Sequence, residues 1–231
     1  MPCHRSSTTL LLALAALLCA CTSTSNYPTE TYDGLVLVPD TEFAQVYRRP
    51  GADLGGYQAY GLEHCEVAFR KDWLRSQNTG RMDLGSRVTQ RDVDRIKDTL
   101  GDLCDKYFRE ALEQAPPYPL VATYDEGQPV LVLRPAIINL DINAPDTSSS
   151  AMTRTYTTSS GEMTLALEIF DGTTGEILYR IVDRRRSTET HNMQWTNSVT
   201  NQAEARRWLK GWASQLRQGL DAVKVSPGVG N

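Results

Sequence analysis

The chain has 231 residues, of which 40% are hydrophobic and 23% are charged, and its formal net charge is −4. These fractions are ordinary for a globular protein and leave room for one domain with appendages. The mildly acidic balance disfavours a nucleic-acid partner, because that role needs a basic surface.

Residues 1–20 have the pattern of a secretory signal peptide. Arg5 supplies positive charge ahead of an apolar run over residues 10–20. This run is too short to span about 30 Å of hydrocarbon, and it is typical of the apolar region of a signal peptide. It ends in the sequence LCAC at residues 18–21, which resembles the lipobox of bacterial lipoproteins.

Cys21 is therefore the predicted acylation site, and the polar residues 21–34 are the predicted tether. Because several acyl chains hold a protein durably on a bilayer, the first expected partner is a membrane. What is known of lipoprotein sorting implies that Asp after the cysteine would retain the protein at the inner membrane. Thr22 stands there instead, which predicts the periplasmic face of the outer membrane. The alternative is an ordinary secretory signal cleaved nearby.

The other two cysteines of the mature chain are Cys65 and Cys104. An oxidising compartment favours a disulfide between them, which would join a predicted helix to a predicted strand. The alternative is two buried free thiols that behave as small apolar side chains.

The elements of a single domain are expected over residues 35–225. A short apolar run from Leu35 to Val38 opens it, and the glycines within residues 48–62 predict an irregular loop. Alternating apolar side chains over residues 64–71 predict a strand. Residues 75–88 are polar and predict a loop.

The first long helix is predicted to begin after Thr89, where Asp92 would complete a capping box. Its apolar stripe consists of Val93, Ile96, Leu100, Leu103, Cys104, Tyr107 and Ala111. Pro116 and Pro117 end it. The apolar run over residues 130–142 predicts a strand, and Pro135 requires that this strand be bulged or at an edge there.

A hairpin is predicted from residues 162–171 and 176–186, with its turn at residues 171–175. The last helix is predicted to start at the N-cap Asn201, with Glu204 as the acid of a capping box. The side chains expected to face inward are Ala205, Trp208, Leu209, Trp212, Leu216, Leu220 and Val223, and those expected to face outward are Arg206, Arg207, Lys210 and Arg217. A short disordered tail is expected at residues 226–231.

This order of elements predicts an α+β fold, a two-layer sandwich in which two long helices pack on one face of a mostly antiparallel sheet. The first helix lies between two strands, so that pair is a candidate for a parallel crossover.

Several segments together resemble a widespread family of uncharacterised proteobacterial lipoproteins. They are the lipobox, residues 65–69 followed by Asp72-Trp73, residues 107–112, and above all residues 170–176 together with residues 183–185. The resemblance covers most of the mature chain. It implies an envelope location and this fold, and no catalytic residues.

The sequence lacks the local patterns of common enzymes. It contains no Gly-x-Ser-x-Gly elbow, no His-Glu-x-x-His, and no phosphate-binding or dinucleotide-binding glycine motif. Its two mature histidines, His64 and His191, are far apart, so no metal site is predicted. We therefore expect no cofactor and no enzymatic activity.

Two loops are candidates for a binding site, at residues 143–160 and 187–200. The hairpin topology sends both to the sheet end opposite the turn at residues 171–175, where aromatic and charged side chains would gather. They are Arg154, Tyr156, Arg186, Glu189, His191 and Trp195. The alternative is two polar loops with Trp195 packed in the core.

Basic side chains at residues 184–186 and on the outer face of the last helix are a second candidate. They could meet an anionic envelope glycan or lipid headgroups, or they could form an ordinary solvated surface. The sequence thus predicts a non-enzymatic envelope lipoprotein that binds a protein or an envelope component. The alternatives are an auxiliary subunit of an envelope transport or assembly complex and a periplasmic hydrolase.

Overall fold

The computed structural model describes residues 27–79, 82, 84–124, 129–142, 156–157, 161–187, 194–195 and 198–225. The predicted signal peptide, the acylation site Cys21, Thr22 and the predicted tail at residues 226–231 lie outside these ranges.

Eight strands form one sheet in the order β1-β2-β9-β8-β6-β3-β5, with β4 also paired to β6. Their bounds are β1 Val36–Val38, β2 Gln45–Arg48, β3 Ala59–Leu62, β4 Glu66–Phe69, β5 Leu120–Val121, β6 Val130–Asp141, β8 Glu162–Asp171 and β9 Ile177–Arg186. A separate two-stranded sheet pairs β7, Tyr156–Thr157, with β10, Gln194–Trp195.

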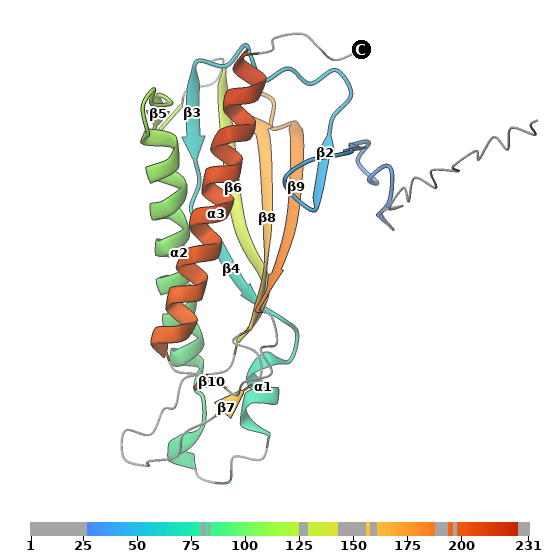
Figure 1. Cartoon of the computed structure of the whole chain (residues 1–231). Helices are drawn as coiled ribbons and strands as arrows, with labels where there is room; N and C mark the ends of the chain where they lie inside the picture. The colour runs from blue at the N-terminus through green and yellow to red at the C-terminus, as the bar shows by residue number, and fades with distance from the viewer. Residues whose placement is uncertain are drawn as a thin grey trace, which may run out of the picture.

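Two long helices, α2 (Gln90–Glu113) and α3 (Ser198–Val225), run side by side along the sheet (Figure 1). Apolar residues from both helices and from β4, β6, β8 and β9 form one continuous core. The predicted α+β arrangement of an open, mostly antiparallel sheet with two long helices is confirmed. A six-residue helix, α1 (Trp73–Asn78), and a 3-10 turn (Leu84–Ser86) lie where a loop was expected, so that part of the prediction is wrong.

The strands on either side of α2 are parallel, as the crossover hypothesis expected. β4 precedes α2 in the chain and pairs parallel with β6, which follows it. β3 also pairs parallel with β6, although it lies in the stretch predicted as an irregular loop. This strand has only four residues and includes Gly61, where a Cβ atom would lie 3.3 Å from Val132. The glycine that indicated a loop therefore allows close packing within the sheet.

β6 is a central strand even though Pro135 cannot donate a backbone hydrogen bond. β3 pairs with residues 130–133 of β6, and β4 pairs with β6 from Ala136 onward, so Pro135 faces the gap between them. On that side the carbonyl of Leu133 accepts a hydrogen bond from the amide of Glu63. Because a strand repeats every two residues, the backbone nitrogen of Pro135 faces the same side as the backbone groups of Leu133. The expected edge exists, but only locally, where the neighbouring strand is interrupted.

The start of α2 agrees with the sequence prediction, and the start of α3 does not. α2 begins after Thr89, and its predicted capping box with Asp92 is present. α3 begins at Ser198, so Asn201 lies inside the helix and is not its N-cap. The Glu204 carboxylate instead accepts a hydrogen bond from the Ser187 hydroxyl at the end of β9.

Arg217 corrects the predicted outer face of α3, because its side chain is only 6% exposed. Its guanidinium donates to backbone carbonyls at the end of α2, namely those of Ala111, Leu112, Gln114 and Pro116. A helix leaves its last carbonyls without partners inside the helix, and arginine carries five donors. Burial of Arg217 therefore satisfies the C-terminal end of a neighbouring helix.

Candidate functional site

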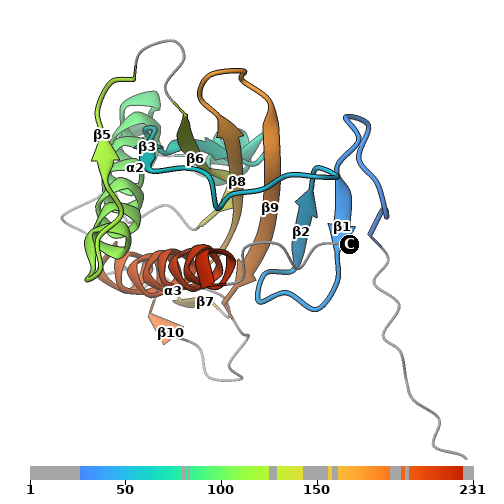
Figure 2. The same cartoon turned by 90° about the horizontal axis from the view of Figure 1, so that it is seen from above.

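The sheet has one face packed on the helices and a second face that we call the open face. Figure 2 shows α3 running along one side of β8 and β9. Because side chains alternate along a strand, every second residue of β6, β8 and β9 points away from α3. In these strands, the residues of the open face are Val130, Val132, Arg134, Ala136, Ile138, Glu162, Thr164, Ala166, Glu168, Phe170, Arg180, Val182, Arg184 and Arg186. Val130, Val132 and Phe170, at one end of this face, are buried in a separate apolar cluster with Tyr124.

A row of alternating charges runs across β6, β8 and β9 on the open face. Arg134, Glu168 and Arg180 lie directly opposite one another on β6, β8 and β9. Arg180 Nε lies 3.1 Å from Glu168 Oε1, and Arg134 lies 3.8 Å from the other carboxylate oxygen. Glu63 extends the row beyond Arg134 at 2.5 Å, and Asp33 extends it beyond Arg180 at 2.9 Å. Opposite charges placed directly across a sheet stabilise the pairing of strands.

Asp33 lies in a turn that is fastened to this row. Both oxygens of its carboxylate accept from Arg180, and one also accepts from the Thr31 hydroxyl. These hydrogen bonds, with that from Arg180 the strongest, hold the pKa of Asp33 well below its usual range. The turn is followed by Leu35, which is fully buried. The charge row thus ties the first described segment of the chain to the middle of the sheet.

A second charged group lies at the far end of the same face. The Glu162 carboxylate on β8 accepts from Arg184 at 2.5 Å and from Arg186 at 2.9 Å on β9. Chiefly through the hydrogen bond from Arg184, the pKa of Glu162 is held below its ordinary value. Arg185 points to the other side, where it contacts Asp183, Gln215 and the ring of Trp212. The predicted basic cluster at residues 184–186 is therefore divided between two faces and paired with acids.

Between the two charged groups lies a strip of small side chains, formed by Ala136, Ala166 and Val182 in register across β6, β8 and β9. All three are half-buried, so their apolar surface partly faces solvent. The ion pairs on either side of the strip join four arginines to four carboxylates: Arg134, Arg180, Arg184 and Arg186 with Glu63, Glu168, Asp33 and Glu162. The open face therefore combines a small apolar strip with charges that balance in total, although the charge row has one carboxylate in excess and the group at Glu162 has one arginine in excess.

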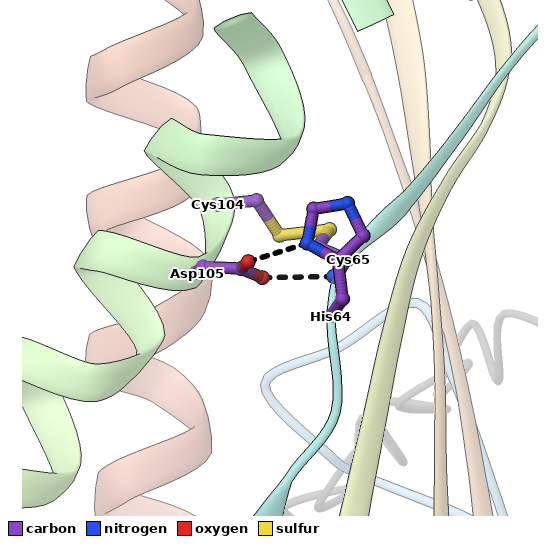
Figure 3. Close-up of a disulfide and its surroundings, with 4 residues drawn as sticks. All are labelled: His64, Cys65, Cys104 and Asp105. Carbon is purple, nitrogen blue, oxygen red and sulfur yellow. Dashed lines mark hydrogen bonds and ion pairs between the residues drawn. A yellow bond between two sulfur atoms is a disulfide. The ribbon is translucent and has the colours of Figure 1, made fainter. Parts of the chain in front are cut away.

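Cys65 and Cys104 form a disulfide that joins the gap between β3 and β4 to α2. Figure 3 shows His64 and Cys65 facing Cys104 and Asp105 of the helix. Asp105 accepts from the Cys65 amide at 2.8 Å and from His64 Nδ1 at 2.6 Å. A Cβ atom at Gly101 would lie 3.0 Å from the Cys65 carbonyl, so this glycine permits the close approach of α2.

The hydrogen bond to Asp105 raises the pKa of His64, while partial burial opposes that shift. The Asp105 carboxylate also satisfies a backbone amide that the interrupted strand leaves without a ladder partner. This cluster therefore has a structural explanation, and both of its sulfur atoms are used in the disulfide.

Only part of the predicted binding loops can be placed. Arg154, Glu189 and His191 lie outside the described residues. Tyr156 of β7 lies directly opposite Trp195 of β10, so the backbones of the two predicted loops meet. Arg186 lies at the end of β9, in its pair with Glu162.

Only part of the charge row could be predicted from the sequence. The hairpin turn sets the register that places Glu168 opposite Arg180, so this pair could have been found. Asp33 and Glu63 come from distant segments, and no local pattern points to them.

Neither a metal site nor a membrane span is found in the part of the chain that the structure describes. No group of three or more His, Cys, Asp or Glu side chains is placed there to hold a metal ion. None of the described helices is long and apolar enough to cross a membrane.

Solved structures similar to this chain include a PelC dodecamer from Paraburkholderia phytofirmans, at 9% identity and a TM-score of 0.36, covering 74% of this chain and 96% of that one. A neuraminyllactose-binding hemagglutinin homolog from Helicobacter pylori is 8% identical with a TM-score of 0.31, covering 76% of this chain and 84% of that one. Likeness at this level carries no functional argument. The curated proteins contain no match to the chain. The family described as proteins of unknown function, DUF3313, matches residues 25–216, and the chain belongs to it.

Proposed function

We propose that this protein is a lipid-anchored interaction module at the periplasmic face of the outer membrane, which binds a partner protein through the open face and catalyses no reaction. The observation that carries the proposal is the composition of that face, a half-buried strip of Ala136, Ala166 and Val182 between two sets of ion pairs.

The balance of charge favours a protein over an anionic glycan. Each of the four arginines on the face lies within 4 Å of a carboxylate, so a polyanion would have to compete with these pairs and would also meet the three carboxylates of the charge row. Protein interfaces commonly combine an apolar centre with a polar rim. Fixed charges at such a rim select a complementary partner more than they add affinity.

The anchor is supported by the sequence. The lipobox-like residues 18–21 place a cysteine after two small residues, and Thr22 follows it. A tether between Cys21 and the first described residue, Tyr27, would leave the open face free to meet a partner anchored in the same membrane.

A site-specific photo-crosslinker tests the binding face in cells that carry the full chain. Ala166 on the open face is one position, and Ala222, exposed on α3, is the matched control. We expect one discrete crosslinked protein at position 166 and none at position 222. The substitution Ala166→Glu should abolish that adduct when the crosslinker is placed at Val182, whereas Ala222→Glu should leave it intact. Equal adducts at both positions, or none at 166, would overturn the proposed binding face.

The anchor has its own test. The variant Cys21→Ser should move from the membrane fraction to the aqueous extract, and mass spectrometry of the wild-type N-terminus should show acyl chains on Cys21. A wild type that partitions like the variant would refute the anchor and leave the crosslinking result to stand alone.

A further inference from the structure

Exposed apolar side chains concentrate where the described chain begins. Among the described residues, five large hydrophobic side chains are exposed, and three of them lie within one stretch of ten: Tyr27, Tyr32 and Val36. Tyr32 is 97% exposed, Tyr27 is 42% exposed and Val36 is 43% exposed. The other two, Met82 and Leu84, belong to a separate segment after α1.

Tyr32 lies in a turn with several internal hydrogen bonds, and its side chain projects from that turn. The Thr31 amide donates to the Leu35 carbonyl at 2.8 Å, and the Gly34 amide donates to the Thr31 carbonyl at 3.0 Å. The next residue, Asp33, is bound by Arg180 through two hydrogen bonds. The backbone on both sides of Tyr32 is therefore fixed. Most of its ring surface faces solvent, and the Arg180 guanidinium lies 5.9 Å from the ring centroid.

These residues border the edge of the sheet. β1 is the last strand of the sheet on this side, and Val36 belongs to it. Residues 29–30 lie along its outer edge, where Glu30 bridges to Val36 and the Leu37 amide donates to the Thr29 carbonyl at 2.9 Å. Val36 thus lies at this border, and Tyr32 lies in the turn that reaches from it to Arg180 of β9. We call Tyr27, Tyr32 and Val36 together the N-terminal edge.

The N-terminal edge is also the part of the domain nearest to the proposed anchor. Tyr27 is six positions after Cys21, and a fully extended chain of that length reaches about 20 Å. An acylated Cys21 would therefore keep this edge close to the lipid headgroups. Tyrosine suits that region, because its ring is apolar and its hydroxyl can remain hydrated.

We infer that the N-terminal edge docks on the bilayer surface, with Tyr27, Tyr32 and Val36 entering the headgroup region. This inference rests on the proposed lipid anchor. The tyrosines then fix the orientation of a domain that the tether alone would leave free to turn.

Fluorescence quenching by brominated lipids tests the contact directly. The full acylated chain is reconstituted into vesicles of phosphatidylethanolamine with brominated phosphatidylcholine, as the variants Tyr32→Trp and Met82→Trp. Met82 is 96% exposed and supplies the matched control. The wild type gives the background of the four native tryptophans. We expect the added emission of the Tyr32→Trp variant to be lost and that of the Met82→Trp variant to be unchanged.

The outcomes separate the two proposals. If Cys21 is acylated and the Tyr32→Trp emission persists, the docking inference is overturned while the anchor stands. Quenching of both variants also overturns it, because contact would not be specific to the N-terminal edge. If mass spectrometry finds no lipid on Cys21, the proposed anchor fails and the inference that depends on it fails as well.

Discussion

Arg180 donates two hydrogen bonds of 2.9 Å to the carboxylate of Asp33, a residue 147 positions earlier in the chain. Arginine suits this position because its planar guanidinium can engage both oxygens of a carboxylate at once. The same guanidinium reaches Glu168 on the neighbouring strand at 3.1 Å. One side chain therefore joins the N-terminal turn, β9 and β8.

The substitution Asp33→Asn should release that turn. We expect the free energy of unfolding at pH 7 to fall by about 1 to 2 kcal/mol, the range for a charged hydrogen bond near solvent. The pKa of Asp33 is depressed in the folded state, so its stabilisation is present above the unfolded value of about 3.9 and is lost as the pH falls through the folded value. Urea unfolding at pH 7 and pH 3 measures the difference.

The exposed Glu42 provides a matched control, because Glu42→Gln removes a carboxylate charge outside the row. That variant should unfold like the wild type at both pH values. An Asp33→Asn variant as stable as the wild type at pH 7 would show that the turn is held by its backbone alone.

Substitution of Arg217 is expected to lower stability more than substitution of most other charged residues. Arg217→Met removes the donor for four carbonyls at the end of α2 and the partner of Asp221. Leaving such groups unpaired should cost about 3 kcal/mol, whereas Arg206→Met on the exposed face should change stability by less than about 0.5 kcal/mol. The melting temperatures of the two variants, measured under the same conditions, test this difference. Equal melting temperatures would mean that water replaces the guanidinium.

The disulfide closes a loop of 39 residues between Cys65 and Cys104. In the chain-entropy account, a cross-link of this span stabilises the folded state by about 4 kcal/mol, because it restricts the unfolded chain. The double variant Cys65→Ala, Cys104→Ala should lose about that much in urea unfolding without a reductant. With a reductant present, the wild type should approach the variant. If a reductant leaves the free energy of unfolding of the wild type unchanged, the disulfide contributes little to stability.

His64 and Asp105 predict a pH-dependent difference between the wild type and Asp105→Asn. The pKa of His64 is raised by its hydrogen bond to Asp105, with smaller contributions from Glu66 and Asp102. A raised folded pKa gives stability that is complete below the unfolded value of about 6.5 and is lost as the pH rises through the folded value. The gap in melting temperature should therefore be larger at pH 6 than at pH 9.

Titration of the His64 ring by NMR provides the direct measurement. In the Asp105→Asn variant, the pKa of His64 should move down toward its ordinary value. The gap that remains at pH 9 reports the acceptor for the Cys65 amide, which is independent of the histidine charge. A melting-temperature gap that does not change with pH would assign the whole effect to that amide.

Some features of the fold follow from short stretches of sequence. The capping box of Thr89 and Asp92 and the hairpin between β8 and β9 were predicted from residues that lie within a few positions of each other. The start of α3 was misplaced, because Asn201 has the chemistry of a cap but the helix continues past it to Ser198. β3 was missed because four residues with a central glycine carry no clear alternation.

The face of Arg217 was also misassigned from the sequence. Helical spacing alone placed it with the solvated cations Arg206 and Arg207. Its burial depends on where α2 ends and on the carbonyls that are left there, which the sequence of α3 does not contain.

The sequence by itself determined the two long helices, the hairpin and the two cysteines available for a disulfide, because caps, turns and apolar periodicity act over a few neighbouring residues. Only the tertiary structure decided that Cys65 and Cys104 lie close enough to bond, at a Cα separation of 6.1 Å. Likewise, only the tertiary structure shows that Asp33 contacts Arg180 and that Glu63 contacts Arg134, because these contacts depend on the order of the strands in the sheet. These two contacts join residues far apart in the sequence, so local sequence patterns do not indicate them.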